Sequence, residues 1–194
     1  MKLNTALDLF ILELQDLLSA EVQIIDSLPR MVEFAKDAQL KSVLAEHLDQ
    51  TRAQLKRLKE VGEILNVDVT GKTCEGIKGL LKEGEAVISL EGTTQLLDTA
   101  LISVARRIEH YEIAGYGGLI MFASTLKEKD VEKLLSQSLK EEKEMDQKLD
   151  TFAYLKIWDF ILVSKGYARS NIRLNPKIVA SVSAEDESAN EPSR

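Results

Sequence analysis

The stretch that decides the fold is residues 101–120, which read LISVARRIEHYEIAGYGGLI. Apolar residues recur every three or four positions along it, the spacing that places them on one face of an α-helix. Glu109 and Glu112 interrupt that face between Ile108 and Ile113. Two carboxylates three residues apart on one helical face can reach a common site. This stretch therefore predicts a helix that faces a protein core and carries acids into it.

Three other long segments share this helical pattern, so that the predicted helices cover residues 5–36, 40–66, 94–124 and 130–163. A short turn joins the first helix to the second and the third to the fourth, so each pair is expected to form an antiparallel hairpin. Pro29 lies inside the first helix and is expected to kink or break it.

The connection between the two hairpins, residues 66–92, is long and holds a short helix over residues 73–88 that three glycines weaken. A connection of this length carries the chain along a bundle, as in ferritin-like topology. We therefore expect an all-α, ferritin-like four-helix bundle of two antiparallel hairpins joined by a crossover that contains a short helix.

The chain is expected to form one domain, residues 1–163, because 194 residues suffice for one substantial core. Its last stretch, residues 181–194, reads SVSAEDESANEPSR. This composition is polar and lacks aromatic residues, which is typical of disordered chain. Residues 164–194 are therefore expected to form an irregular C-terminal tail.

The composition indicates where the protein is located and which kinds of partner it does not bind. A net charge of −7 argues against nucleic acid, because binding to phosphates needs a basic surface. Asp8, Glu13 and Asp16 interrupt the apolar N-terminal segment, and no apolar run approaches the roughly 20 residues of a membrane span. The single cysteine, Cys74, excludes an intramolecular disulfide and fits a reducing compartment. We expect a cytoplasmic protein that binds neither nucleic acid nor membrane.

Further acids interrupt the apolar faces of the first and the last predicted helix. Every position three or four residues from Glu21 is apolar, and Glu142 and Asp146 lie between apolar residues in the same way. A buried carboxylate without a partner is costly, and such groups are normally paired or bind a metal. These acids are therefore expected to point into the core and to need a counter-charge there.

Counting residues from the two turns predicts the heights of these groups. At 1.5 Å per residue, Glu21, Glu109 and Glu142 lie about 22–26 Å from their turns, near the middle of the bundle. His47, on the second helix, is expected roughly 10 Å above that level. We therefore expect His47 to be an outer ligand beside Asp146, and the carboxylates to be central.

Several carboxylates at one level repel each other unless a cation neutralises them, so this arrangement predicts a site for a metal pair. Oxygen-rich sites suit iron, manganese, magnesium or calcium, and the helical bundle favours iron or manganese. The predicted metal ligands are Glu21, His47, Glu109, Glu112, Glu142 and Asp146.

A metal-free arrangement is the alternative. The acids would then form an internal polar layer that fixes the register of the helices, and the protein would act as a dimer through its surface without catalysing a reaction. Water would satisfy the acids in this arrangement, together with the side chains of Arg106, Arg107, Tyr111 and Tyr116.

Five stretches of the chain closely resemble the YciF-type bacterial stress proteins. They are residues 17–25 (LLSAEVQII), 46–51 (EHLDQT), 73–80 (TCEGIKGL), 107–114 (RIEHYEIA) and 141–143 (EEK), within a resemblance that covers residues 5–160. The resemblance implies a ferritin-like bundle distantly similar to rubrerythrins, a homodimer, a link to stress responses and no established reaction.

Rubrerythrin-like proteins build a di-iron site from two halves, each with a Glu on one helix and a Glu-x-x-His on the next, and an extra Glu on the third helix. The resemblance therefore implies a di-iron-like centre with redox activity towards peroxide or oxygen. The positions that match the family's carboxylates are Glu21, Glu109, Glu112 and Glu142. The histidine positions depart from the pattern, because Thr51 and Gln54 stand on the second helix and Met145 replaces the other histidine.

Overall fold

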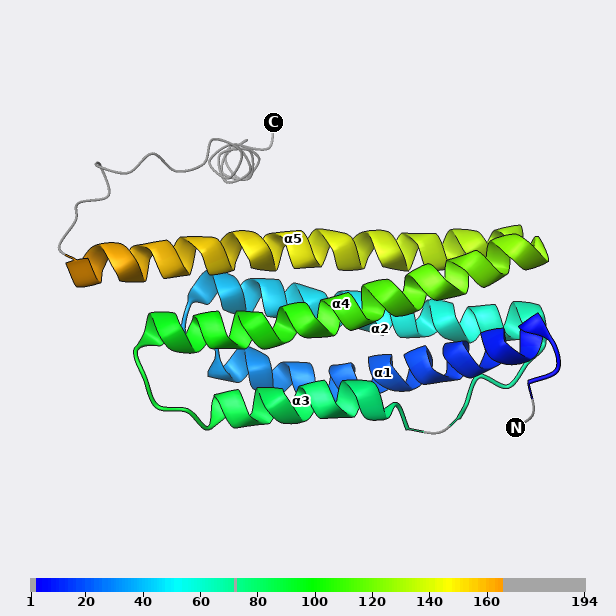
Figure 1. Cartoon of the computed structure of the whole chain (residues 1–194), viewed down its shortest axis with the longest axis horizontal. Coiled ribbons are helices and arrows are strands. Elements are labelled where there is room, and N and C mark those ends of the chain that lie inside the picture. Colours follow the sequence, from blue (N-terminus) through cyan, green and yellow to red (C-terminus); the bar gives the residue numbers. More distant parts are fainter. Residues whose placement is uncertain (1–2, 72, 166–194) are drawn as a thin grey trace, which may run out of the picture.

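The computed structural model describes residues 3–71 and 73–165, of which residues 158, 159 and 162–165 by their backbone only. The regular secondary structure of these residues is entirely α-helical. Its elements are α1 (Ala6–Phe34), α2 (Ala38–Leu65), α3 (Glu75–Ile88), α4 (Thr94–Leu126) and α5 (Lys129–Lys165). Hairpins α1–α2 and α4–α5 pack together, and α3 lies in the crossover along α1 and α4 (Figure 1). The predicted all-α bundle is confirmed, whereas the predicted tail lies, from residue 166 onward, outside the described residues.

The helix ends have clear local causes. Thr5 and Asp8 form a capping box at the start of α1, in which the Asp8 amide donates to Thr5 Oγ1 at 3.1 Å and the Thr5 amide donates to Asp8 Oδ2 at 2.8 Å. Asp37 caps α2 by accepting from the amide nitrogens of its first turn. Asn66 and Lys127 end α2 and α4 in the left-handed conformation that follows many helices.

Helix α1 continues through Pro29, so this residue does not end the helix. Proline removes one backbone hydrogen bond from the helix interior. Leu28 and Met31 on either side are buried, at 2% and 3% exposure, and their packing holds the last turns in place. Tertiary contacts therefore outweigh the local preference here.

A buried acid aligns the two hairpins. The Asp98 side chain, near the start of α4, accepts from the Lys36 amide at 2.8 Å and from the Asp37 amide at 3.0 Å. These amides belong to the turn between α1 and α2 and have no partner within a helix. Because Asp98 is only 1% exposed, this contact fixes the start of α2 at the level of the first turns of α4.

Helix α3 is attached to the bundle through its N-terminal residue, Cys74. The Cys74 amide donates to Ser19 Oγ at 2.9 Å, and the buried thiol lies 2.9 Å from the Tyr111 hydroxyl, which donates to Asp16 Oδ2 at 2.5 Å. Burial raises the pKa of the Cys74 thiol. A Cβ atom at Gly76 would lie 2.7 Å from the Tyr111 ring, so this close approach requires glycine. Among the described residues, no helix carries an apolar stretch long enough to cross a membrane.

Candidate metal centre

Four buried side chains from three helices converge in the bundle interior. His47 comes from α2, Glu109 and Glu112 from α4, and Glu142 from α5; one ligand atom of each lies within 4.8 Å of those of the others. His47 is 2% exposed and the three acids are fully buried. We call these four residues the acid cluster. Helices α2 and α4 both pack against α1 and α5, so the cluster forms where they face each other across the interior.

The contact between His47 and Glu109 is not an ion pair. His47 Nε2 lies 3.1 Å from Glu109 Oε1, yet neither ring nitrogen of His47 has a hydrogen-bond partner. Burial lowers the pKa of His47 to about 4, so the imidazole is neutral near pH 7. A neutral imidazole next to a carboxylate is the arrangement that a metal ion can bridge, because both groups offer lone pairs.

Most carboxylate oxygens of the cluster lack a partner within the protein. Both oxygens of Glu109, both of Glu112 and Oε2 of Glu142 are buried without a hydrogen bond. Burial raises the pKa of Glu109 and Glu112 well above that of an exposed glutamate, and the nearby charge of Glu142 adds to this effect. Burial also raises the pKa of Glu142, to about 7. Buried polar atoms are normally satisfied, so this many acceptors without a partner at one place is an arrangement to which a cation could bind.

Glu21 lies beside the acid cluster but outside the four residues whose ligand atoms meet. It is fully buried, and the Tyr116 hydroxyl donates a hydrogen bond to its Oε1 atom while Oε2 has no partner. Burial raises the pKa of Glu21 well above the ordinary value, and the charge of Glu142 raises it further. Glu21 is thus half satisfied by the protein.

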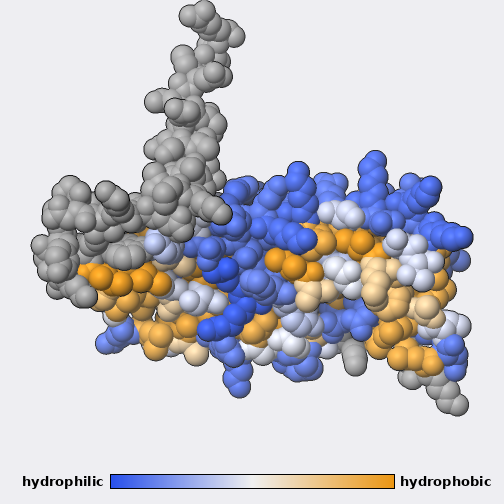
Figure 2. Space-filling view, turned by 45° about the horizontal axis from the view of Figure 1, so that its top comes forward, coloured by the Kyte–Doolittle hydropathy of each residue, from blue (hydrophilic) through white to orange (hydrophobic). Residues whose placement is uncertain are grey.

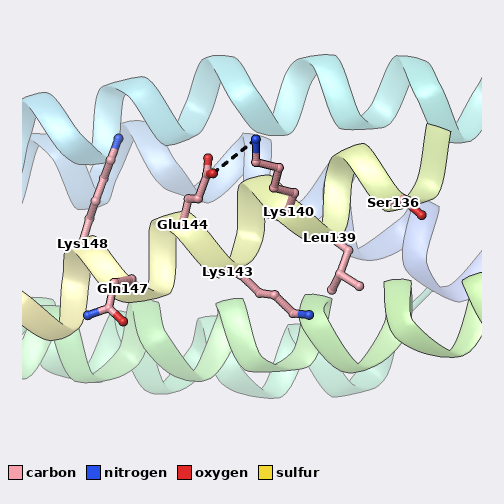
Figure 3. A pocket seen from close by; sticks show the side chains of 7 residues that line it. All are labelled: Ser136, Leu139, Lys140, Lys143, Glu144, Gln147 and Lys148. Atoms are coloured by element: carbon pink, nitrogen blue, oxygen red, sulfur yellow. Dashed lines mark ion pairs between the residues drawn. The ribbon is translucent and has the colours of Figure 1, made fainter. Parts of the chain in front are cut away.

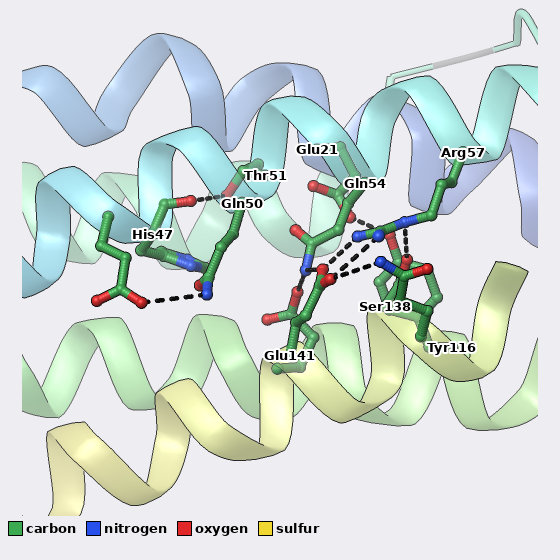
Figure 4. Close-up of polar contacts among 12 residues, drawn as sticks. Glu21, His47, Gln50, Thr51, Gln54, Arg57, Tyr116, Ser138 and Glu141 are labelled. Atoms are coloured by element: carbon green, nitrogen blue, oxygen red, sulfur yellow. Dashed lines mark hydrogen bonds and ion pairs between the residues drawn. The ribbon is translucent and has the colours of Figure 1, made fainter.

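A second polar group lies next to the acid cluster, towards the other end of α2 (Figure 4). Arg57 donates from Nε to Ser138 Oγ at 3.0 Å and from Nη1 to Glu141 Oε1 at 3.0 Å, and its other terminal nitrogen pairs with Glu141 Oε2. Gln54 Nε2 donates to Glu141 Oε2 at 3.3 Å and also to Glu142 Oε1. We call Gln54, Arg57, Ser138 and Glu141 the paired layer. In contrast to the acid cluster, its acid faces a positive charge.

The sequence placed His47 and Asp146 differently from the structure. Asp146 pairs with Arg106 Nε at 2.8 Å and lies 3.5 Å from His110 Nε2, outside the acid cluster. His47, expected about 10 Å from the carboxylates, contacts Glu109 directly. The reason is the contact made by Asp98. His47 is ten residues beyond Asp37 and Glu109 eleven beyond Asp98, so both side chains lie at one height.

The side chains named for a metal-free polar layer leave the acid cluster unsatisfied. One of the four, Tyr116, reaches an interior acid, Glu21. The other three bind elsewhere: Tyr111 to Asp16, Arg106 to Asp146 and Asp150, and Arg107 to Glu83. The protein's own donors therefore do not replace a cation in the acid cluster.

Helix α5 also carries an open surface groove that differs in chemistry from the interior (Figure 3). Its acid, Glu144, already faces Lys140 at 3.6 Å. The residues that line it are Ser136, Leu139, Lys140, Lys143, Glu144, Gln147 and Lys148, none of which belongs to the acid cluster. An excess of lysine disfavours a cation there, so the interior is the better candidate.

Two antiparallel hairpins joined by a helical crossover, with buried acids from three helices, define a ferritin-like helical bundle. Comparison with known proteins gives its family. Residues 5–160 match the family described as a domain of unknown function, DUF892, and the chain belongs to this family, the YciF-type proteins. The predicted resemblance is thereby confirmed.

The relatives are similar over most of their length. Protein YciF of Escherichia coli (strain K12) is 35% identical over 154 residues, which cover 79% of this chain and 93% of that protein. The crystal structure of the E. coli stress protein YciF superposes with a TM-score of 0.78 at 34% identity, covering 80% of this chain and 98% of that one. YcfI, a putative structural protein from Rhodopseudomonas palustris, gives a TM-score of 0.75 at 37% identity, covering 77% and 96%.

Proposed function

We propose that the protein binds iron or manganese in the acid cluster. The observation that carries this proposal is the set of buried carboxylate oxygens, both those of Glu109 and both those of Glu112 among them, that have no partner. Leaving such groups unpaired costs the folded protein stability, and a cation removes that cost. The buried arginine Arg57 is already paired with Glu141.

The donor set fits these metals. One imidazole nitrogen and several carboxylate oxygens are ligands that iron and manganese accept, whereas calcium and magnesium prefer oxygen alone. His47 offers a neutral imidazole, since burial lowers its pKa to about 4. Its two ring nitrogens are both free of hydrogen bonds, so either can serve as the ligand atom.

For the reaction, we propose peroxide or oxygen as the oxidant, in keeping with a relative that is called a stress protein. Iron or manganese, when bound, supplies electrons for such chemistry. The protein contributes a site closed to water, in which the buried side chains of the acid cluster would hold the ion.

Metal analysis of the purified protein tests the proposal. The chain is stripped with a chelator, loaded with Mn(II) or, without air, Fe(II), passed through a desalting column and assayed for bound metal. Retained metal that is lost in Glu112→Gln supports the proposal, with Glu144→Gln on the surface of α5 as the matched control. Wild-type protein that retains neither metal contradicts it.

A second candidate is a homodimer that acts through its surface without catalysis. Its support is a set of exposed apolar side chains, with Met121 60%, Ile64 44% and Val22 40% exposed, and a relative described as a putative structural protein. Hydrophobic patches alternate with hydrophilic ones on the face shown in Figure 2. In this case Glu21→Ala alters stability or assembly, measured by sedimentation, while metal content stays near zero in both forms. A stoichiometric metal lost in Glu21→Ala would contradict this candidate.

A further inference from the structure

Glu142 belongs to the acid cluster and also accepts a hydrogen bond from the paired layer. This contact leaves the two carboxylate oxygens of Glu142 in different surroundings. Gln54 Nε2 donates to Glu142 Oε1 and lies 3.3 Å from Glu141 Oε2. The amide orientation is fixed, because an amide oxygen in that place would face two other acceptors. Oε1 of Glu142 therefore already accepts one hydrogen bond, whereas Oε2 has no partner.

Arg57 places a permanent positive charge beside this contact. Arg57 is 9% exposed, and its guanidinium donates hydrogen bonds to Ser138 Oγ and to both oxygens of Glu141. A guanidinium stays charged at every physiological pH. Its charge acts on Glu21 as well as on Glu141. This part of the interior thus already contains a cation that belongs to the protein.

The dimensions of the acid cluster also suit one ion. Its four ligand atoms lie within 4.8 Å of one another. Ligands on opposite sides of one ion, with bonds of about 2.1 Å, stand about 4.2 Å apart. The two ions of a dinuclear centre are themselves about 3.5–4 Å apart, so their ligands extend over a clearly longer span.

We propose that the acid cluster holds a single metal ion and that the guanidinium of Arg57, fixed by the paired layer, stands where a dinuclear centre has its second ion. This inference rests on the proposed metal binding and departs from the metal pair that the family resemblance implies. In this inference Arg57 and Gln54 determine the metal-to-protein ratio. Arg57 supplies positive charge, and the two side chains occupy the half of the interior that would otherwise accept another ion.

The metal-to-protein ratio of the full chain tests the inference. Chelator-treated protein is titrated with Mn(II) by calorimetry, and the loaded, desalted protein is assayed for manganese and examined by EPR. One Mn(II) per chain with the spectrum of an uncoupled ion is expected. Two per chain with a coupled spectrum would overturn the inference and leave the proposed function standing. No retained metal would overturn the proposed function itself.

A variant pair tests the part assigned to the paired layer. The double substitution Gln54→His and Arg57→Met removes the guanidinium and adds a ligand, and it is expected to raise the ratio from one to two. Arg106→Met, which removes an arginine that pairs with Asp146 away from the acid cluster, is expected to keep it at one. A folded double variant that still binds one ion would overturn the role of Arg57 and Gln54. If the double variant does not fold, the wild-type ratio and EPR spectrum still decide the stoichiometry.

Discussion

The paired layer and the acid cluster are neighbours in one bundle interior, yet they treat buried acid in opposite ways. Glu141 in the paired layer is matched by Arg57 and retains some exposure, with 21% of its side chain accessible. Glu109 and Glu112 in the acid cluster are fully buried and have no partner. The difference indicates that a buried acid matched by a charge within the chain needs no further partner, whereas the unmatched acids of the cluster have their proposed counter-charge in an ion from solution.

The largest effect is expected from breaking the paired layer with Arg57→Met. This change leaves Glu141 without its counter-charge and Ser138 without the Arg57 contact, and removing one partner of a buried ion pair costs about 3 kcal/mol. The free energy of unfolding, measured with urea, is expected to fall by that amount. Arg106→Met is the control, because its half-exposed pairs with Asp146 and Asp150 are worth less than about 1 kcal/mol. Equal losses in both variants would contradict the distinction.

The next effect is expected from Glu112→Gln in the acid cluster, and it has two opposite parts. Affinity for Mn(II), measured by calorimetry, is expected to fall about 100-fold, or about 2.8 kcal/mol, because a charged ligand is lost. The metal-free protein is expected to become more stable to urea, because the substitution removes the cost of keeping this buried carboxyl group either protonated or charged. A variant with unchanged affinity and lower stability would show that Glu112 is structural.

In the metal-free protein, the acid cluster is expected to make the free energy of unfolding depend on pH. Burial raises the pKa of Glu109 and Glu112 well above the ordinary value and that of Glu142 to about 7. The folded state therefore holds protons that the unfolded chain has released, so stability falls as pH rises through the raised pKa values. The slope is about 1.4 kcal/mol per pH unit for each such proton.

This slope is best measured by urea unfolding between about pH 5 and about pH 7, the interval from the ordinary pKa of a glutamate to the raised pKa of Glu142. His47 has the opposite sign, because burial lowers its pKa to about 4 and stability is lost only as pH falls below about 6.5. Metal-loaded protein is expected to lose the slope, because the metal requires the deprotonated carboxylates. A metal-free protein whose stability is constant over this range would contradict the raised pKa values.

The smallest effect is expected from Asp146→Asn, which changes an acid at the height of the cluster but outside it. Asp146 pairs with Arg106 and is partly exposed, so the free energy of unfolding is expected to change by less than about 1 kcal/mol. Affinity for Mn(II) should stay within about twofold of the wild type, because Asp146 lies outside the acid cluster. A tenfold change would correspond to about 1.4 kcal/mol. A larger loss of affinity would place Asp146 among the ligands.

Helical periodicity predicted four of the buried acids, but it also placed Asp146, which is only partly buried, in the core, and it did not single out the buried Asp98. Glu21, Glu109, Glu112 and Glu142 each lie between apolar residues one turn away, and each is fully buried in the structure. Periodicity fixes the direction in which a side chain points and therefore the face of the helix that meets the core. This information is local, which is why it can be read without the fold.

The relative heights of the helices could not be predicted in the same way. They depend on the contact of Asp98 with the amides of Lys36 and Asp37, which are more than sixty residues away in the chain. A local signal for its burial was present, because Leu101 and Ile102 follow Asp98 at helical spacing. Its partners were not visible, so His47 was expected too far from Glu109.

The paired layer was missed for a related reason. Arg57 precedes the buried residues Leu58 and Val61, but a long basic side chain on an apolar face commonly extends to solvent. Its partner Glu141 lies 84 residues further along the chain. Glu141 also sits next to Glu142 in a charged run, where an acid is most often exposed. Only the fold brings the two together.

The contact made by Asp98 has a consequence for how freely the chain can be re-engineered. Because this carboxylate aligns the hairpins, their alignment does not depend on the length of the connection between α3 and α4. That connection is exposed around Leu90 and Gly92, and doubling the length of a flexible loop costs only about 0.6 kcal/mol. A peptide tag or a whole guest domain spliced in at Gly92 should thus leave the bundle interior undisturbed.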